Sequence, residues 1–136
     1  MTELKVPVSV GELIDKITIL EIKSQRIADP DKLANVRKEL AHLSRTWEES
    51  PLADADIGDD RAKLKRINET LWDIEDDIRR LEAAGDFSER FVELARAVYL
   101  TNDERAAAKR RINEATGSAL VEEKSYADYR RSPEKN

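Results

Sequence analysis

The chain has 136 residues, enough for one domain with a modest core, and its 39% charged residues with only four glycines and four prolines favour long helices. The absence of cysteine excludes disulfides, thiol nucleophiles and cysteine-bound metals, and the single histidine excludes a histidine metal cluster within one chain. Residues 48–60 carry six acidic residues and no base, so this segment accounts for the net charge of −5, and no basic nucleic-acid-binding surface is indicated.

Two helices are predicted before the acidic segment. Ser9 and Glu12 have the spacing of a capping box, which predicts a helix over residues 10–28. Pro30 follows a capping aspartate and opens a second predicted helix over residues 30–49. Because the connection is short, the two helices are expected to fold back on each other as an antiparallel hairpin.

Two further helices are predicted after an acidic loop, which we place at residues 50–59. Apolar side chains recur every three or four residues over residues 60–84, and one of two adjacent aspartates is expected to cap this third helix. Gly85 suits the left-handed position that ends it. The fourth helix is predicted over residues 87–116 and ends at Gly117.

The chain ends are expected to lie outside these helices. Residues 1–8 carry alternating apolar side chains, which predicts an extended arm that packs on a neighbouring subunit. Residues 119–130 are expected to form a short C-terminal helix or a tail packed on the helices by two tyrosines, and residues 131–136 a flexible tail. The prediction is therefore an all-α, antiparallel bundle of four main helices in a single domain, residues 1–136.

The first predicted helix has two apolar faces. Ile19 and Ile22 lie opposite the stripe of leucines and isoleucines that serves the hairpin, and their own stripe also carries Glu12, Asp15 and Arg26. A further helix or a second subunit must cover this stripe. We expect a homodimer that buries Ile19 and Ile22.

Polar residues interrupt the apolar stripes of the third and fourth helices. The stripe of the fourth helix turns polar after Val98, and in the third helix Asn68, Trp72, Glu75 and Arg79 form a stripe beside the apolar one. Charges in such positions must be paired or solvated, because an isolated buried ion is costly. One interpretation is an internal network of salt bridges that sets the helix register or a dimer interface.

The second interpretation is a polar pocket between the helices. Two carboxylates three residues apart on a helix project together, which suits Mg²⁺ bound through oxygen, and basic side chains suit phosphate or carboxylate groups. The candidate Mg²⁺ ligands are Glu12 and Asp15. The candidate ligand-binding residues are Glu75, Arg79, Asn102, Arg105 and Lys109.

Other chemistry and other locations are not indicated. His42 lies off the apolar stripe and is interpreted as a surface residue, and the serines have capping or turn explanations, so no Ser-His-Asp arrangement is expected. No apolar run approaches the ~18 residues of a membrane span, and the amino terminus has no cleavage pattern. We expect a cytoplasmic protein that neither inserts into a membrane nor binds nucleic acid.

Several segments together resemble an uncharacterised bacterial family of short helical proteins, classed as a domain of unknown function. The matching segments read PVSVGELIDKITILEIK, WDIEDDIR, VYLTNDERAAAKRRIN and EEKSY, and the resemblance runs roughly from Val6 to Tyr126. It implies a small helical bacterial protein and carries over no activity. A weaker resemblance is to the all-α nucleoside triphosphate pyrophosphatases of the MazG type, in which ELID matches the first half of a Mg²⁺ motif and WDIEDD lacks the second.

The function expected from these features is a non-enzymatic, self-associating interaction module or small-ligand-binding module. The alternative is a Mg²⁺-dependent hydrolase or binder of nucleotides, nucleotide sugars or sugar phosphates that uses the charged cluster between the helices. No cofactor is expected for the first function, and Mg²⁺ is expected for the alternative.

Overall fold

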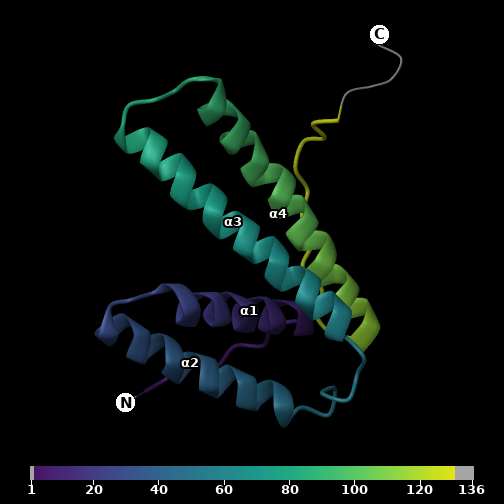
Figure 1. Cartoon of the computed structure of the whole chain (residues 1–136). Helices are drawn as coiled ribbons and strands as arrows, with labels where there is room; N and C mark the ends of the chain where they lie inside the picture. The colour runs from purple at the N-terminus through teal and green to yellow at the C-terminus, as the bar shows by residue number, and fades with distance from the viewer. Residues whose placement is uncertain (1, 131–136) are drawn as a thin grey trace.

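The computed structural model describes residues 2–130, which contain four helices and confirm the all-α class (Figure 1). Each helix begins and ends within two residues of its predicted bounds. The flexible tail predicted for residues 131–136 lies outside the described residues. The helices are α1 (Val10–Arg26), α2 (Pro30–Glu48), α3 (Gly58–Ala83) and α4 (Glu89–Thr116).

Helix ends that depend on local chemistry match the prediction, whereas α3 and α4 each start two residues from the predicted position. Ser9 caps α1 by accepting the backbone N–H of Glu12, and Gly85 adopts the left-handed conformation after α3. The predicted aspartate cap of α3 is wrong: the helix begins two residues earlier, after Ile57, whose side chain is buried in the core. Packing of that side chain, rather than a cap, determines where α3 starts.

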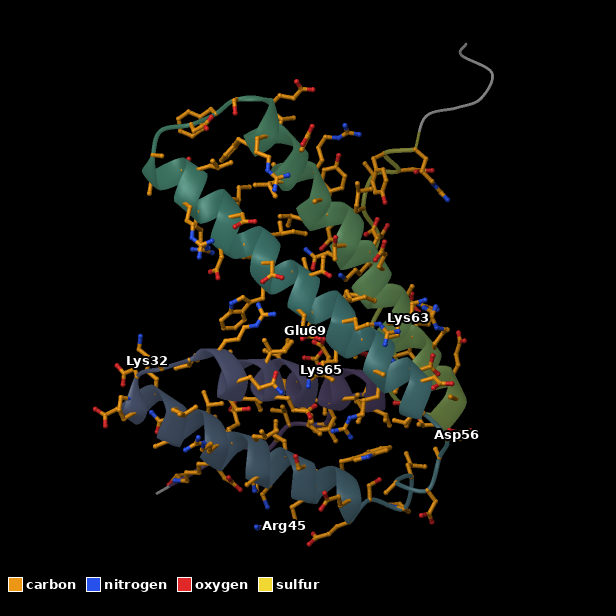
Figure 2. The ribbon with its side chains drawn as sticks, viewed as in Figure 1. Lys32, Arg45, Asp56, Lys63, Lys65 and Glu69 are labelled. Carbon is orange, nitrogen blue, oxygen red and sulfur yellow. The ribbon has the colours of Figure 1, made fainter. Side chains whose placement is uncertain are left out.

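The four helices form two hairpins, α1–α2 and α3–α4, and α1 joins them by packing on both α3 and α4. Helix α1 packs against the other three, whereas α2 packs on α1 alone among the helices. The α3–α4 hairpin extends past α1, so the two hairpins diverge (Figure 1). Side chains from both hairpins meet where they cross, and Lys65 and Glu69 project from α3 toward α1 (Figure 2).

The hydrophobic core lies at this crossing. Ile14 and Ile17 of α1, Leu64 of α3 and Ile112 of α4 are completely buried against one another. The predicted acidic loop contributes to the same core, because the apolar side chains among its carboxylates turn inward and pack on it. The loop therefore has a structural role that its charge alone does not indicate.

A close approach joins α1 to α4. A Cβ atom at Gly11 would lie only 2.5 Å from the carbonyl oxygen of Lys109. The backbone N–H of Gly11 also donates a hydrogen bond of 2.6 Å to Oδ1 of Asn113. Glycine at this position thus allows the first turn of α1 to rest directly on the backbone of α4.

The second face of α1 is covered within the chain. Ile22 is only 1% exposed, because α3 and α4 pack on the face that the sequence assigned to a partner. The prediction that Ile19 and Ile22 form a dimer surface is therefore wrong for Ile22. A homodimer through another surface stays a prediction.

The two chain ends are non-helical in the described residues. The amino-terminal segment, residues 2–8, is an extended arm that lies near α2, where the Glu3 carboxylate is 3.5 Å from Nε2 of His42. Residues 118–130 run back along α4 as a tail, so the alternative of a short C-terminal helix is wrong (Figure 1). The tail's polar side chains bond to α1 and α4 and hold it in this extended path.

Candidate functional site

A buried carboxylate lies at the centre of the charged cluster. Asp15 is 1% exposed, and its Oδ1 accepts hydrogen bonds of 2.9 Å from both Nε of Arg105 and Nδ2 of Asn68. Its Oδ2 accepts a 2.5 Å bond from Nη2 of Arg105. Asn68 also donates to the hydroxyl of Thr18 at 3.0 Å. The bidentate ion pair and the asparagine together compensate the burial of the charge.

Arg105 is held rigidly and keeps its charge. The hydrogen bonds that Arg105 donates to the Asp15 carboxylate raise the pKa of Arg105 above its usual value, and burial opposes this effect only in part. Asp15 engages two of the five N–H donors that a guanidinium carries. The Arg105 side chain is 31% exposed, so the remaining edge is within reach of a ligand.

Arg105 lines a crevice where α1, α3 and α4 meet. The crevice has a volume of about 480 Å³, within the range of roughly 300–1,000 Å³ that is usual for small-ligand sites. Apolar side chains form one part of its wall, and a few polar groups converge on it. The apolar part consists of Ile19, Ile22, Leu71 and Trp72, and the polar part of Asn68, Glu75, Asp76, Asn102 and Arg105.

The predicted ligand-binding residues divide between this crevice and its surroundings. Glu75, Asn102 and Arg105 line the crevice together. Lys109 lies one helical turn further along α4, where its Nζ is 2.5 Å from the Glu12 carboxylate. Arg79 is largely exposed and pairs with Glu75 at 3.3 Å on the helix surface, outside the crevice lining.

The predicted Mg²⁺ ligands are both bonded to basic side chains. Glu12 pairs with Lys109, and Asp15 pairs with Arg105. Within residues 2–130, no three acidic or histidine side chains gather where they could hold a metal ion. Binding of Mg²⁺ by Glu12 and Asp15 stays a prediction, and it requires the cation to displace both ion pairs.

Selecting charged residues from the sequence misses two neutral members of the site. Asn68 and Trp72 occupy the same stripe of α3 as Glu75, and both line the crevice. The guanidinium of Arg26 lies 5.8 Å from the ring centre of the half-buried Trp72. The stripe spacing was the available signal, because residues three and four apart share one face of a helix.

Comparison with known proteins identifies the family. The model of a family of unknown function, DUF6165, matches residues 4–135. The chain belongs to this family. No curated protein and no solved structure matches it. Membership agrees with the resemblance to short helical proteins of unknown function, whereas the bacterial origin and the resemblance to MazG-type enzymes stay predictions.

The length and apolar character of the helices determine whether one of them could span a membrane. Over the described part of the chain, none of them combines the length and the apolar character that crossing a membrane requires.

Proposed function

We propose that this DUF6165 protein is a non-enzymatic binding module that takes a small anionic ligand in the crevice between α1, α3 and α4. The observation that carries the proposal is the bidentate pair of Arg105 with buried Asp15. It orients a permanently charged guanidinium beside the crevice before any ligand arrives. A guanidinium fixed in this way suits the two oxygens of a phosphate or carboxylate.

The rest of the crevice favours a ligand with a planar or apolar body. Trp72, Ile19 and Leu71 offer an apolar wall, and Asn102 and Glu75 offer donors and acceptors for hydroxyl or amide groups. Nucleotides, nucleotide sugars and sugar phosphates combine an anionic group with such a body. We therefore place the ligand in this class.

Binding without turnover fits the ion pairs better than hydrolysis does. A Mg²⁺-dependent hydrolase needs free carboxylates to hold the metal and to accept a proton. Glu12, Asp15 and Glu75 each pair with a basic side chain instead. A Mg²⁺-dependent hydrolase is the alternative function, and ligand binding that requires Mg²⁺ would favour it.

The test is thermal unfolding with a panel of these compounds, each with Mg²⁺ and with a chelator. A ligand at a hundredfold excess over its Kd stabilises the native state by about 2.7 kcal/mol, which raises the Tm by several degrees. We expect one compound class to do so equally with and without Mg²⁺. A rise that needs Mg²⁺ and is lost in Glu12→Gln would replace the proposal with the hydrolase, and a flat panel would refute both.

Two variants locate the site. Trp72→Leu keeps apolar bulk and removes the aromatic wall, so we expect it to abolish most of the Tm rise. Arg80→Gln is the control on the same helix: Arg80 and its partner Asp77 both lie outside the crevice lining, so this variant should leave the rise unchanged. Equal effects of the two variants would place the ligand elsewhere.

A second candidate function is self-association through the diverging α3–α4 hairpin. Its far end and the first half of α4 carry exposed apolar side chains, Phe87 at 60%, Val92 at 51% and Leu100 at 40%. Covering them is a driving force for a homodimer. Light scattering of the purified chain should give a dimer mass that Val92→Asp reduces to a monomer. A monomer for the unchanged chain at high concentration would exclude this function.

A further inference from the structure

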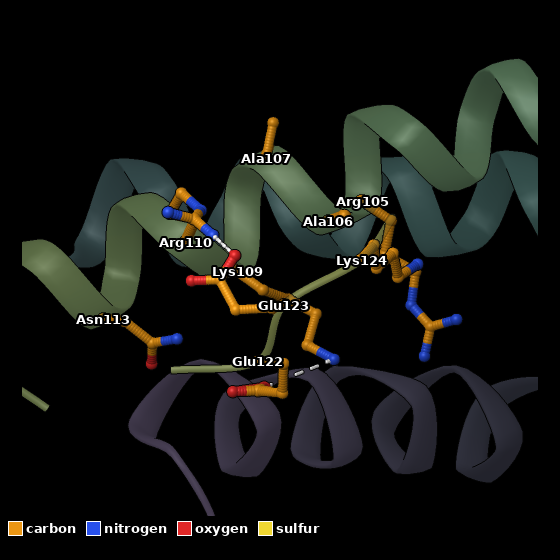
Figure 3. Close-up of a pocket in the computed structure, with 9 residues that line it drawn as sticks. All are labelled: Arg105, Ala106, Ala107, Lys109, Arg110, Asn113, Glu122, Glu123 and Lys124. Carbon is orange, nitrogen blue, oxygen red and sulfur yellow. Dashed lines mark hydrogen bonds and ion pairs between the residues drawn. The ribbon is translucent and has the colours of Figure 1, made fainter. Parts of the chain in front are cut away.

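The C-terminal tail follows a defined path although each of residues 119–130 is exposed. It passes between α4 and α1 and then continues along α4 (Figure 3). At its start, the hydroxyl of Ser118 accepts a 3.1 Å bond from the backbone N–H of Val10. Near its end, the hydroxyl of Tyr129 donates a 2.6 Å bond to Asp103. Polar contacts therefore hold both ends of the tail in place.

Between these ends, two tail carboxylates lie on basic residues of α4. The Glu123 carboxylate is 2.7 Å from Nη2 of Arg110, and the Glu122 carboxylate is 3.7 Å from Nζ of Lys109. Figure 3 shows these two ion pairs as dashed lines. Glu122 also accepts a 2.7 Å hydrogen bond from the hydroxyl of Ser9. The middle of the tail is thus attached mainly by charge.

A cavity lies beneath this part of the tail. It has a volume of about 320 Å³, and Arg105, Lys109, Arg110 and Asn113 of α4 form one side of it (Figure 3). Glu122, Glu123 and Lys124 of the tail form the other side.

Two basic side chains of the cavity have ion-pair partners outside the tail. On the α1 side, Glu12 orients Lys109 and Asp15 orients Arg105. If the tail left, Arg110 would lose its ion pair with Glu123, and Lys109 would lose its ion pair with Glu122. The α4 side of the cavity would then be an open groove, formed by Arg105, Lys109, Arg110 and Asn113, with more unpaired positive charge. Arg105 and Lys109 would keep the partners that orient them.

We propose that this groove is a binding site for phosphate groups, and that the tail is a tethered competitor whose Glu122 and Glu123 occupy it until a phosphate compound displaces them. Carboxylate and phosphate oxygens use the same lysine and arginine donors. Phosphate carries more charge than one carboxylate, and partly exposed ion pairs such as those of the tail are individually weak. The groove and the crevice share Arg105 and no other lining residue, so phosphate binding in the groove can be tested apart from ligand binding in the crevice.

The first test is a titration of the full chain with sodium pyrophosphate, followed by ¹⁵N–¹H spectra. We expect a saturable shift of the Lys109, Arg110 and Asn113 amide signals, together with movement of the signals of residues 118–130 toward random-coil positions. Sodium chloride at the same ionic strength is the control for screening of the ion pairs. If chloride has the same effect as pyrophosphate, or if the groove signals shift while the tail signals stay, the proposal is overturned.

The second test removes the competing carboxylates. The double variant Glu122→Gln, Glu123→Gln should bind pyrophosphate roughly three- to tenfold more tightly, because two weak competing ion pairs are lost. The matched control is Glu48→Gln, Glu49→Gln, which changes the net charge equally at exposed positions at the end of α2. Equal tightening in both variants would indicate a general charge effect, and no tightening would show that the tail does not compete.

Discussion

Replacing Asp15 by asparagine tests the ion pair on which the crevice depends. The substitution keeps the side-chain shape and one acceptor oxygen, and it removes the negative charge. The new amide group would face the N–H donors of Arg105, so at least one hydrogen bond is lost and the arginine charge is left without its partner.

The expected cost follows from the burial of the two partners. Breaking a fully buried ion pair costs about 3–5 kcal/mol. Arg105 is 31% exposed and can recover part of its hydration, so we expect Asp15→Asn to lower the free energy of unfolding by roughly 2–3 kcal/mol. For a chain of this length that corresponds to a fall in Tm of roughly 6–15 °C.

Urea unfolding followed by circular dichroism measures this difference. The matched control is Asp73→Asn, because Asp73 also pairs with an arginine, Arg26, at 2.7 Å but is 66% exposed. A surface pair of this kind contributes less than about 1 kcal/mol. If Asp15→Asn costs no more than Asp73→Asn, the account of Arg105 as an arginine fixed by a buried carboxylate is refuted.

Two further predictions concern the packing of α1 and the tail. Gly11→Ala should lower the free energy of unfolding in urea by about 1–3 kcal/mol, because the new Cβ would meet the backbone of Lys109. Gly58→Ala is the control and should leave that free energy unchanged, because its Cβ would meet open space. Similar losses in the two variants would contradict the close approach. The hydrogen bond to Asp103 raises the pKa of Tyr129, so its contribution to tail docking is complete below about pH 10 and is lost as pH rises through the raised pKa. The amide signals of the tail should change with tyrosine ionisation, which absorbance near 295 nm measures. Tyr129→Phe should abolish this pH dependence. A tail that still detaches with rising pH in the variant would contradict the role given to Tyr129.

The helices could be predicted because their ends depend on neighbouring residues. Ser9 caps α1 three residues away, and Gly85 and Gly117 adopt the left-handed conformation that ends α3 and α4. The start of α3 could not be placed in this way. It depends on burial of Ile57 among residues that are distant in sequence, and no local pattern reports such packing.

The candidate site could be predicted only in part, for a similar reason. The polar break in the apolar stripe of α4 picks out Asn102, Arg105 and Lys109, but it does not show which acid each base meets. The divergence of the two hairpins decides that Arg79 lies outside the crevice and that Trp72 lies inside it. Both facts depend on the angle between the hairpins, which helical periodicity leaves open.

The most direct test of the crevice as a ligand site uses the two tryptophans. In ¹⁵N–¹H spectra their indole groups give one signal each; Trp72 lines the crevice, while Trp47 is buried in the core and serves as an internal control. We predict that the nucleotide, nucleotide sugar or sugar phosphate that raises the Tm shifts the Trp72 signal saturably and leaves the Trp47 signal in place. A Trp72 signal that stays unchanged at a saturating concentration of that compound would contradict the proposed site.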